Sequence, residues 1–475
     1  MKTSSRSASS YWQLESLQSR IRSLEAEILR VSNKDHPYPE PDAVYKTLLG
    51  VVRARAKRLE EVWQLDSPDI RGDRRLKGIS SNLAKDLQRV AEVFSLVGRV
   101  DSARIPFELL RPLSWVTGEL LVQDCRAVVR LDGQYNYSII SCERKFAELE
   151  WTQFWRKVLA EEDPEGTLRT VLLLGFPSAE ASAVLLHALA AHELGHELAY
   201  RKNEELESIS TKALATVKSS SGAKLQDYVM QAKAEGVEGL GSRDAYELRS
   251  RRVEARLQDI ARSWTDEVFS DLVAARLVGP AFLAAFDRVS PEQEDASDSH
   301  PPSILRRKLV RTYLNHNLPH VIQDEVWKPL FDRSYETKST DLLWELGREI
   351  CEASIEGLSE ILASIRSPLT DHTGLSLLLP KMEEHLEHLA PPSVPLYAYR
   401  EALEPSDVWL LMYAAWHFRL SSRFEKLVES YGWGVEPRKA EVALSNLLLH
   451  ALQSLELRFR WDELRRSRVG GRDGS

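Results

Sequence analysis

The chain has 475 residues, of which 43% are hydrophobic and 28% are charged, and its formal net charge is −8. This length suits about two to four globular domains, and the composition is that of an ordinary folded protein. The acidic balance excludes bulk electrostatic attraction to nucleic acid or to an anionic membrane, so we expect neither as a partner.

The cysteines and the apolar stretches indicate which class of protein this is. Cys125, Cys142 and Cys351 lie far apart and form no CxxC pair, which argues against a disulfide framework and against a zinc ribbon. The N-terminal residues lack the apolar core of a signal peptide, and no stretch is apolar over the length that a bilayer requires. We therefore expect a cytoplasmic protein.

The first predicted element is a coiled-coil-like helix within residues 1–34. Its apolar side chains over 11–33 follow the a/d spacing of a seam. They are Leu14, Leu17, Ile21, Leu24, Ile28 and Val31. Such a seam favours a homodimer through residues 11–33. The alternative is one amphipathic helix that packs on its own domain, because the seam covers under about three heptads.

Residues 35–165 are expected to form a helical domain that contains one β-hairpin. Two β-rich runs, Ala127–Leu131 and Gln134–Ile140, flank the pair Asp132-Gly133. An Asp-Gly pair between such runs predicts a hairpin, because both central residues of the turn take positive φ.

A buried strand is predicted at residues 170–175, which read TVLLLG, and Pro177 closes it. A helix capped near Ser178 should then continue to about Tyr200. As a hypothesis, the edge of this strand binds an extended substrate by adding it as a further strand.

Helical patterns dominate the rest of the chain. Loops are expected at 219–222, at 236–241 and in the acidic stretch 291–299. A long helix over about 244–277 should end at Gly279-Pro280.

One motif in the helix after the predicted strand carries specific chemistry. His192-Glu193-Leu194-Gly195-His196 matches H-E-x-x-H. Residues i and i+4 share a helix face, so both imidazoles can bind one zinc ion. Glu193 is rotated away from them and can act as general base on a water molecule that the metal activates. The alternative, a buried helix that carries two histidines without a metal, leaves five ionisable groups on an apolar helix without compensation.

A third metal ligand is expected from the long helix. Glu267 and Asp271 are again four residues apart and so share a face. Glu267 is the candidate ligand, and Asp271 is the candidate hydrogen-bond acceptor that orients a liganding histidine. Taken alone, such a pair more often marks a solvated helix face.

The segment after the acidic loop reads His300-Pro301-Pro302-Ser303-Ile304-Leu305-Arg306. His300 or Arg306 could stabilise the oxyanion that forms when water attacks an amide carbonyl. The alternative is a Pro-Pro helix start that carries a solvent-facing histidine.

These three motifs, in this order, resemble the gluzincin zinc metallopeptidases, in particular the soluble relatives of the group that contains the CAAX prenyl proteases and the HtpX-type proteases. The matched residues are the HELGH run, Glu267 with Asp271, and His300-Pro301 with Arg306. The resemblance implies a zinc metalloendopeptidase in which His192, His196 and Glu267 hold Zn²⁺ and Glu193 is the catalytic base. It implies that Asp271 supports the ligands and that His300 and Arg306 stabilise the transition state.

The expected fold class is α+β and mostly helical. A zincin-like core with a small sheet, over 166–310, is flanked by the N-terminal helical regions and by a C-terminal helical domain over 311–468. Residues 469–475 read as a disordered tail.

The expected partner is a protein or peptide substrate. Two further readings stay open at this point: an inactive zincin-fold scaffold or sensor, and a helical protein-interaction module without a metal.

Overall fold

The computed structural model describes most of the chain. The described residues are 8–32, 40–64, 70–98, 107–121, 125–132, 137–141, 171–180, 182–231, 242–289, 297–331, 341–400 and 403–470. The chain divides into two compact units, Met1–Ala181 and Ser182–Ser475. The described part of the chain is mostly helical and contains one small sheet, so the coarse fold class is confirmed. The predicted span 166–310 for the core stays a prediction.

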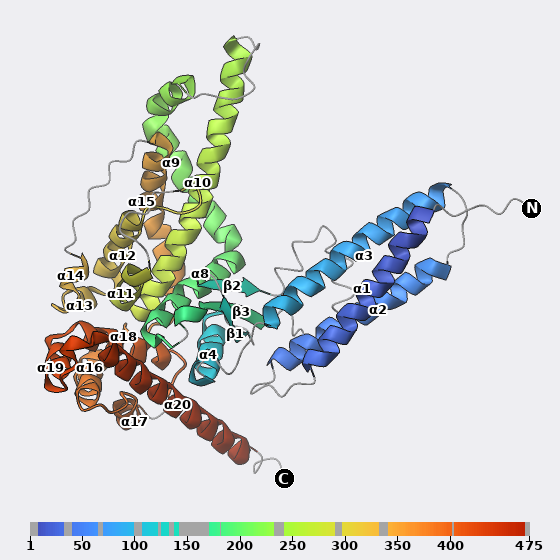
Figure 1. The fold of residues 1–475 in the computed structure, drawn as a ribbon. Coiled ribbons are helices and arrows are strands. Elements are labelled where there is room, and N and C mark those ends of the chain that lie inside the picture. The colour runs from blue at the N-terminus through green and yellow to red at the C-terminus, as the bar shows by residue number, and fades with distance from the viewer. Residues whose placement is uncertain are drawn as a thin grey trace, which may run out of the picture. The chain divides into compact units, whose positions relative to one another are not determined.

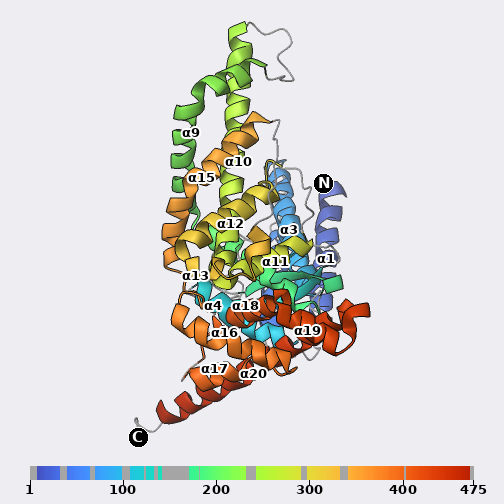
Figure 2. The ribbon, with the colours of Figure 1, turned by 90° about the vertical axis from the view of Figure 1, so that its left-hand side faces the viewer.

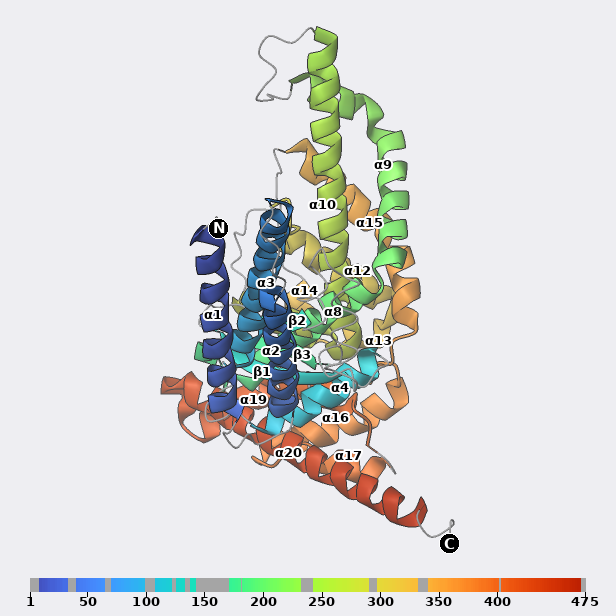
Figure 3. The ribbon, with the colours of Figure 1, turned by 90° about the vertical axis from the view of Figure 1, so that its right-hand side faces the viewer.

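Three helices of the first unit pack side by side, as Figures 1 and 3 show: α1 (Ala8–Ser32), α2 (Glu40–Gln64) and α3 (Ile70–Val97). The seam of α1 faces this bundle, since Leu17, Ile21 and Ile28 are at most 4% exposed. The amphipathic helix packed on its own chain is therefore what the structure contains, and the homodimer stays a prediction.

The sheet of the first unit has the strand order β1-β3-β2. A short 3-10 turn (Phe107–Leu109) leads into α4 (Leu110–Leu121), which packs on β1 (Arg126–Asp132). β3 (Val171–Pro177) pairs parallel with β1 and antiparallel with β2 (Ser138–Ser141). Leu174 of β3 pairs with Val129 on one side and with Ile139 on the other.

The predicted hairpin is wrong, because β1 and β2 do not pair with each other. β3 lies between them, and it is buried along its whole length. A strand that is apolar on both faces is stable only in the interior of a sheet, so it takes the central position. The hypothesis that the edge of this strand binds substrate is wrong for the same reason, since both of its edges are paired. The strand itself is confirmed, and so is its end at Pro177.

The second unit is built around the long helix α10 (Ser242–Val278). This helix contacts α8 (Ala190–Arg201), α9 (Asn203–Gln231), α11 (Pro280–Val289), α12 (Ser303–Asn317) and α15 (Leu342–Ala363). Figure 2 shows α9, α10 and α15 running side by side. The predicted long helix is confirmed, as is its end at Gly279, whose φ is +60°.

Two local predictions need correction. The helix predicted from Ser178 begins as short 3-10 segments, Ser178–Glu180 and Val184–Leu189, before α8. Residues 219–222 are not a loop but a kink at Ser221 inside α9. The packing of α9 on α10 and α15 outweighs the weak helix propensity of these residues. The predicted loop 236–241 and most of 291–299 lie outside the described residues.

The C-terminal part packs around α18 (Asp407–Leu420), which is buried on all sides, as are its side chains Trp409, Met412, Trp416 and Phe418. Helices surround it or connect to it: α13 (Pro319–Ile322), α14 (Lys328–Phe331), α16 (His372–Glu387), α17 (Val394–Tyr399), α19 (Ser422–Ser430), a 3-10 turn (Trp433–Val435) and α20 (Pro437–Gly470). Among the described residues, no helix is both long and apolar enough to cross a membrane.

Candidate metal centre

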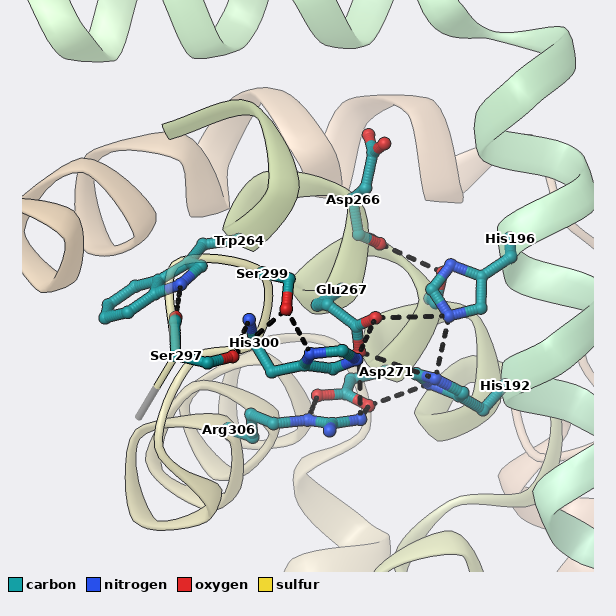
Figure 4. Close-up of polar contacts among 11 residues, drawn as sticks. His192, His196, Trp264, Asp266, Glu267, Asp271, Ser297, Ser299, His300 and Arg306 are labelled. Atoms are coloured by element: carbon teal, nitrogen blue, oxygen red, sulfur yellow. Dashed lines mark hydrogen bonds and ion pairs between the residues drawn. The ribbon is translucent and has the colours of Figure 1, made fainter. Parts of the chain in front are cut away.

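The candidate site lies where α8 and α10 approach each other most closely. At Gly195, a Cβ atom would lie 2.6 Å from Cα of Ser270, which is closer than any real side chain is found. Position 195 must therefore be glycine for α8 and α10 to approach each other this closely. The close approach brings His192 and His196 of α8 against Glu267 and Asp271 of α10, as Figure 4 shows.

Three side chains offer donor atoms to one point. Nε2 of His192 lies 3.1 Å from Nε2 of His196. Oxygens of Glu267 lie 3.7 Å and 3.5 Å from these two nitrogens. The three donor atoms all lie within 4.8 Å of one another. Two imidazoles and one carboxylate form a set that suits a catalytic zinc ion, which leaves a coordination position open.

The other nitrogen of each imidazole is already engaged. The Ser270 hydroxyl donates to the carbonyl of Asp266 at 2.9 Å, so its oxygen accepts a hydrogen bond from Nδ1–H of His196 at 3.0 Å. Nδ1 of His192 lies 2.9 Å from Oδ1 of Asp271. Both Nε2 atoms therefore face each other, and two such lone pairs at 3.1 Å repel unless a proton or a metal ion lies between them. This is the observation that fits a cation at the site.

Asp271 and Arg306 form a buried pair behind His192. The guanidinium of Arg306, on α12, donates two bonds of 2.7 Å to the two oxygens of Asp271. Burial alone would raise the pKa of Asp271, but the charge and hydrogen bonds of Arg306 outweigh it and lower the pKa to about 2. Burial lowers the pKa of His192, yet the bond and charge of Asp271 leave it raised. Asp271 is therefore a permanent anion that orients His192.

Arg306 contacts the cluster a second time, since its Nη2 lies 3.5 Å from Oε2 of Glu267. One guanidinium thus balances two carboxylates in a buried setting. The predicted role of Arg306 in stabilising a transition state stays a prediction, because its strongest contacts are with Asp271.

The electrostatics of Glu193 and His196 also depart from those of exposed groups. Burial raises the pKa of Glu193, while the positive neighbours His192 and Arg306 oppose the shift. The pKa of His196 lies well below its usual value because of burial and because of His192 and Arg306 nearby. His196 is therefore neutral and can act as a metal ligand.

His300 stands on the open side of the cluster. Its side chain is 61% exposed, and its Nε2 lies 3.4 Å from Oε1 of Glu267. Ser299 contacts its Nδ1 at 2.8 Å. The turn that carries it is anchored by two bonds from Arg256 to Asp298, of 2.7 Å and 2.8 Å. Figure 4 shows this turn beside the candidate ligands.

The contacts link six of the seven residues singled out from the sequence into one network: His192, His196, Glu267, Asp271, His300 and Arg306. Glu193 follows His192 on α8 and is half-buried. Sequence reasoning missed Ser270, which fixes His196. The signal was available, since Ser270 lies three residues after Glu267 and therefore near its helix face.

A search of protein-family models, of curated proteins and of solved structures finds no match to this chain.

Proposed function

We propose that this chain is a zinc-dependent peptidase of the H-E-x-x-H type, with a zincin-like core within 166–310. The single observation that carries the proposal is the convergence of His192, His196 and Glu267, with both Nδ1 atoms engaged elsewhere and both Nε2 atoms turned towards one point. The order of motifs, which resembles that of the gluzincin peptidases, supports peptide-bond hydrolysis as the reaction.

Each residue of the site would have its own role in the reaction. When bound, zinc would supply a Lewis acid that acidifies water and polarises the scissile carbonyl. Glu193 would accept the proton of the attacking water and pass it to the leaving amine. Its buried setting favours this role, because burial raises the pKa of its carboxyl group. Asp271 holds the ring of His192, and Ser270 holds that of His196, so neither ligand has to reorient.

Substrate would reach the metal from the side of His300. The side chains of His196 and His300 are 26% and 61% exposed, whereas those of His192 and Glu267 are each only 11% exposed. A hydrogen bond from Nε2 of His300 to the oxyanion would add to the stabilisation that the metal provides.

The test is Glu193→Gln in the full-length chain. The amide cannot accept the water's proton, so cleavage of a labelled unfolded protein should fall by about 10²- to 10⁴-fold while the zinc content stays that of the wild type. Glu384→Gln is the matched control, because Glu384 is exposed on α16, and it should cleave like the wild type. A Glu193→Gln variant as active as the wild type would contradict the proposed mechanism. A wild type that binds zinc but cleaves nothing would favour the inactive scaffold or sensor.

A further inference from the structure

Two phenyl rings of α11 lie behind the metal cluster. Phe282 and Phe286 are one helical turn apart, and their ring centroids lie 5.8 Å from each other. The ring of Phe282 is stacked on that of His192, with centroids 5.9 Å apart and an angle of 8° between the planes. The guanidinium carbon of Arg306 lies 4.6 Å from the centroid of Phe286. Both phenylalanines are buried, at 1% and 8% exposure.

These contacts close a ring of five side chains. His192 contacts Asp271, Asp271 binds Arg306, Arg306 lies over Phe286, and Phe286 contacts Phe282, which returns to His192. Arg306 donates two hydrogen bonds to Asp271, and its guanidinium carbon lies over the Phe286 ring. A planar guanidinium can satisfy both at once, and an ammonium group cannot. The phenyl face therefore selects the one orientation of Arg306 that keeps both bonds to Asp271.

We propose that Phe286 is a positioning residue for the metal centre. Its ring holds the guanidinium of Arg306 in the orientation that donates hydrogen bonds to both oxygens of Asp271. Asp271 in turn orients His192. Phe282 supports this arrangement from the other end by fixing the plane of the His192 ring. The inference rests on the proposed metal site, because its consequence is a tighter hold on zinc.

A buried phenylalanine could equally be a simple filler of the core, and the two roles respond differently to ring fluorination. Fluorine leaves the shape of the ring nearly unchanged but removes the negative potential of its face, on which a cation–π contact depends. Replacing Phe286 by analogues with one, two or three ring fluorines therefore weakens its attraction to Arg306, and less strongly that to Arg307, whose guanidinium carbon lies farther off, at 5.8 Å from the same centroid.

The chain contains a matched control pair. The guanidinium carbon of Arg419 also lies 4.6 Å from the centroid of a buried ring, that of Phe424. The same analogues at position 424 weaken an equivalent contact that is not part of the metal centre. Phe286→Leu serves as a second variant that keeps an apolar side chain and removes the ring.

Two measurements on full-length protein decide the proposal. The first is the Kd for zinc, from competition with a chelator. It should rise stepwise with fluorine number at position 286, to about three- to tenfold, and stay constant in the 424 series. The second is rotation of the Arg306 guanidinium about its Nε–Cζ bond, followed by NMR in metal-free protein, which should become faster in the same order.

An unchanged zinc Kd and an unchanged rotation rate across the 286 series would overturn the proposal and leave Phe286 as a core filler. Equal changes in the 286 and 424 series would overturn it as well. If the wild type binds no zinc, the proposed function fails, and the rotation rate alone then decides whether Phe286 positions Arg306.

Discussion

His192 and His417 both lie in the second unit, and each has one ring nitrogen 2.9 Å from an aspartate oxygen. Their second nitrogens differ. Nε2 of His192 faces another ring nitrogen, Nε2 of His196. Nδ1 of His417 lies 2.6 Å from Oε1 of Glu383. Both nitrogens of His417 must therefore be protonated, since carboxylates can only accept.

The two clusters differ in how their ring nitrogens are partnered. In the cluster of His417, burial lowers its pKa, but Asp324 and Glu383 outweigh burial and raise it to about 9. Glu383 also forms an ion pair with Arg423. Both ring nitrogens of His417 are thus partnered within the protein. In the cluster of His192, by contrast, two ring nitrogens and a carboxylate converge on one point, where a proton or a metal ion can lie between them.

The largest effect should follow from Asp271→Asn. The amide cannot balance the buried charge of Arg306, so we expect the free energy of unfolding to fall by about 3–5 kcal/mol. Zinc affinity should fall by about 10- to 100-fold, because His192 loses the anion that orients it. Urea unfolding and chelator competition measure the two effects. Asp259→Asn, an exposed position on the same helix, should change stability by no more than about 0.5 kcal/mol. An equal effect at both positions would remove the special role of Asp271.

The second prediction concerns pH and the charged histidine. The folded pKa of His417 is about 9, above the ordinary unfolded value of about 6.5. The cluster therefore contributes its full stability, about 3 kcal/mol, below pH 6.5 and loses it as the pH rises through 9. The free energy of unfolding of the wild type should decrease across this window. His417→Gln should be less stable at pH 6 and should show a smaller decrease. Parallel curves for the two proteins would show that His417 is not charged.

A smaller effect is expected for Gly195→Ala. The new methyl group would meet the backbone of Ser270, so α8 and α10 must separate, at a cost of about 1–3 kcal/mol. Zinc affinity should fall too, because the ligands come from both helices. Gly222→Ala is the matched control, since its Cβ would meet nothing within 4 Å, and it should be neutral or slightly stabilising. Tight zinc binding by Gly195→Ala would mean that the close approach is not needed.

The convergence of these side chains could be predicted from the sequence because its determinants are local. His192 with His196, and Glu267 with Asp271, are pairs four residues apart on single helices, and helical periodicity places each pair on one face. The long helix was predictable for the same reason.

Pairings between distant residues could not be predicted. The Asp-Gly pair at 132–133 is a local signal, and it does not reveal that residues 171–177 insert between the two strands. Asp324 and Glu383 lie 93 and 34 residues from His417, so no spacing rule joins them. On α16, Glu383 is buried while the neighbouring Glu384 is exposed, and no spacing rule tells the two apart.

The most direct test of the central claim is the metal content of purified full-length protein, measured by mass spectrometry on the wild type, His192→Ala and His417→Gln. We predict about one zinc ion per chain in the wild type and in His417→Gln, and none in His192→Ala, because only the first cluster leaves nitrogen lone pairs for a metal. A wild type that neither contains zinc nor takes it up on addition would contradict the metal centre and with it the proposed peptidase.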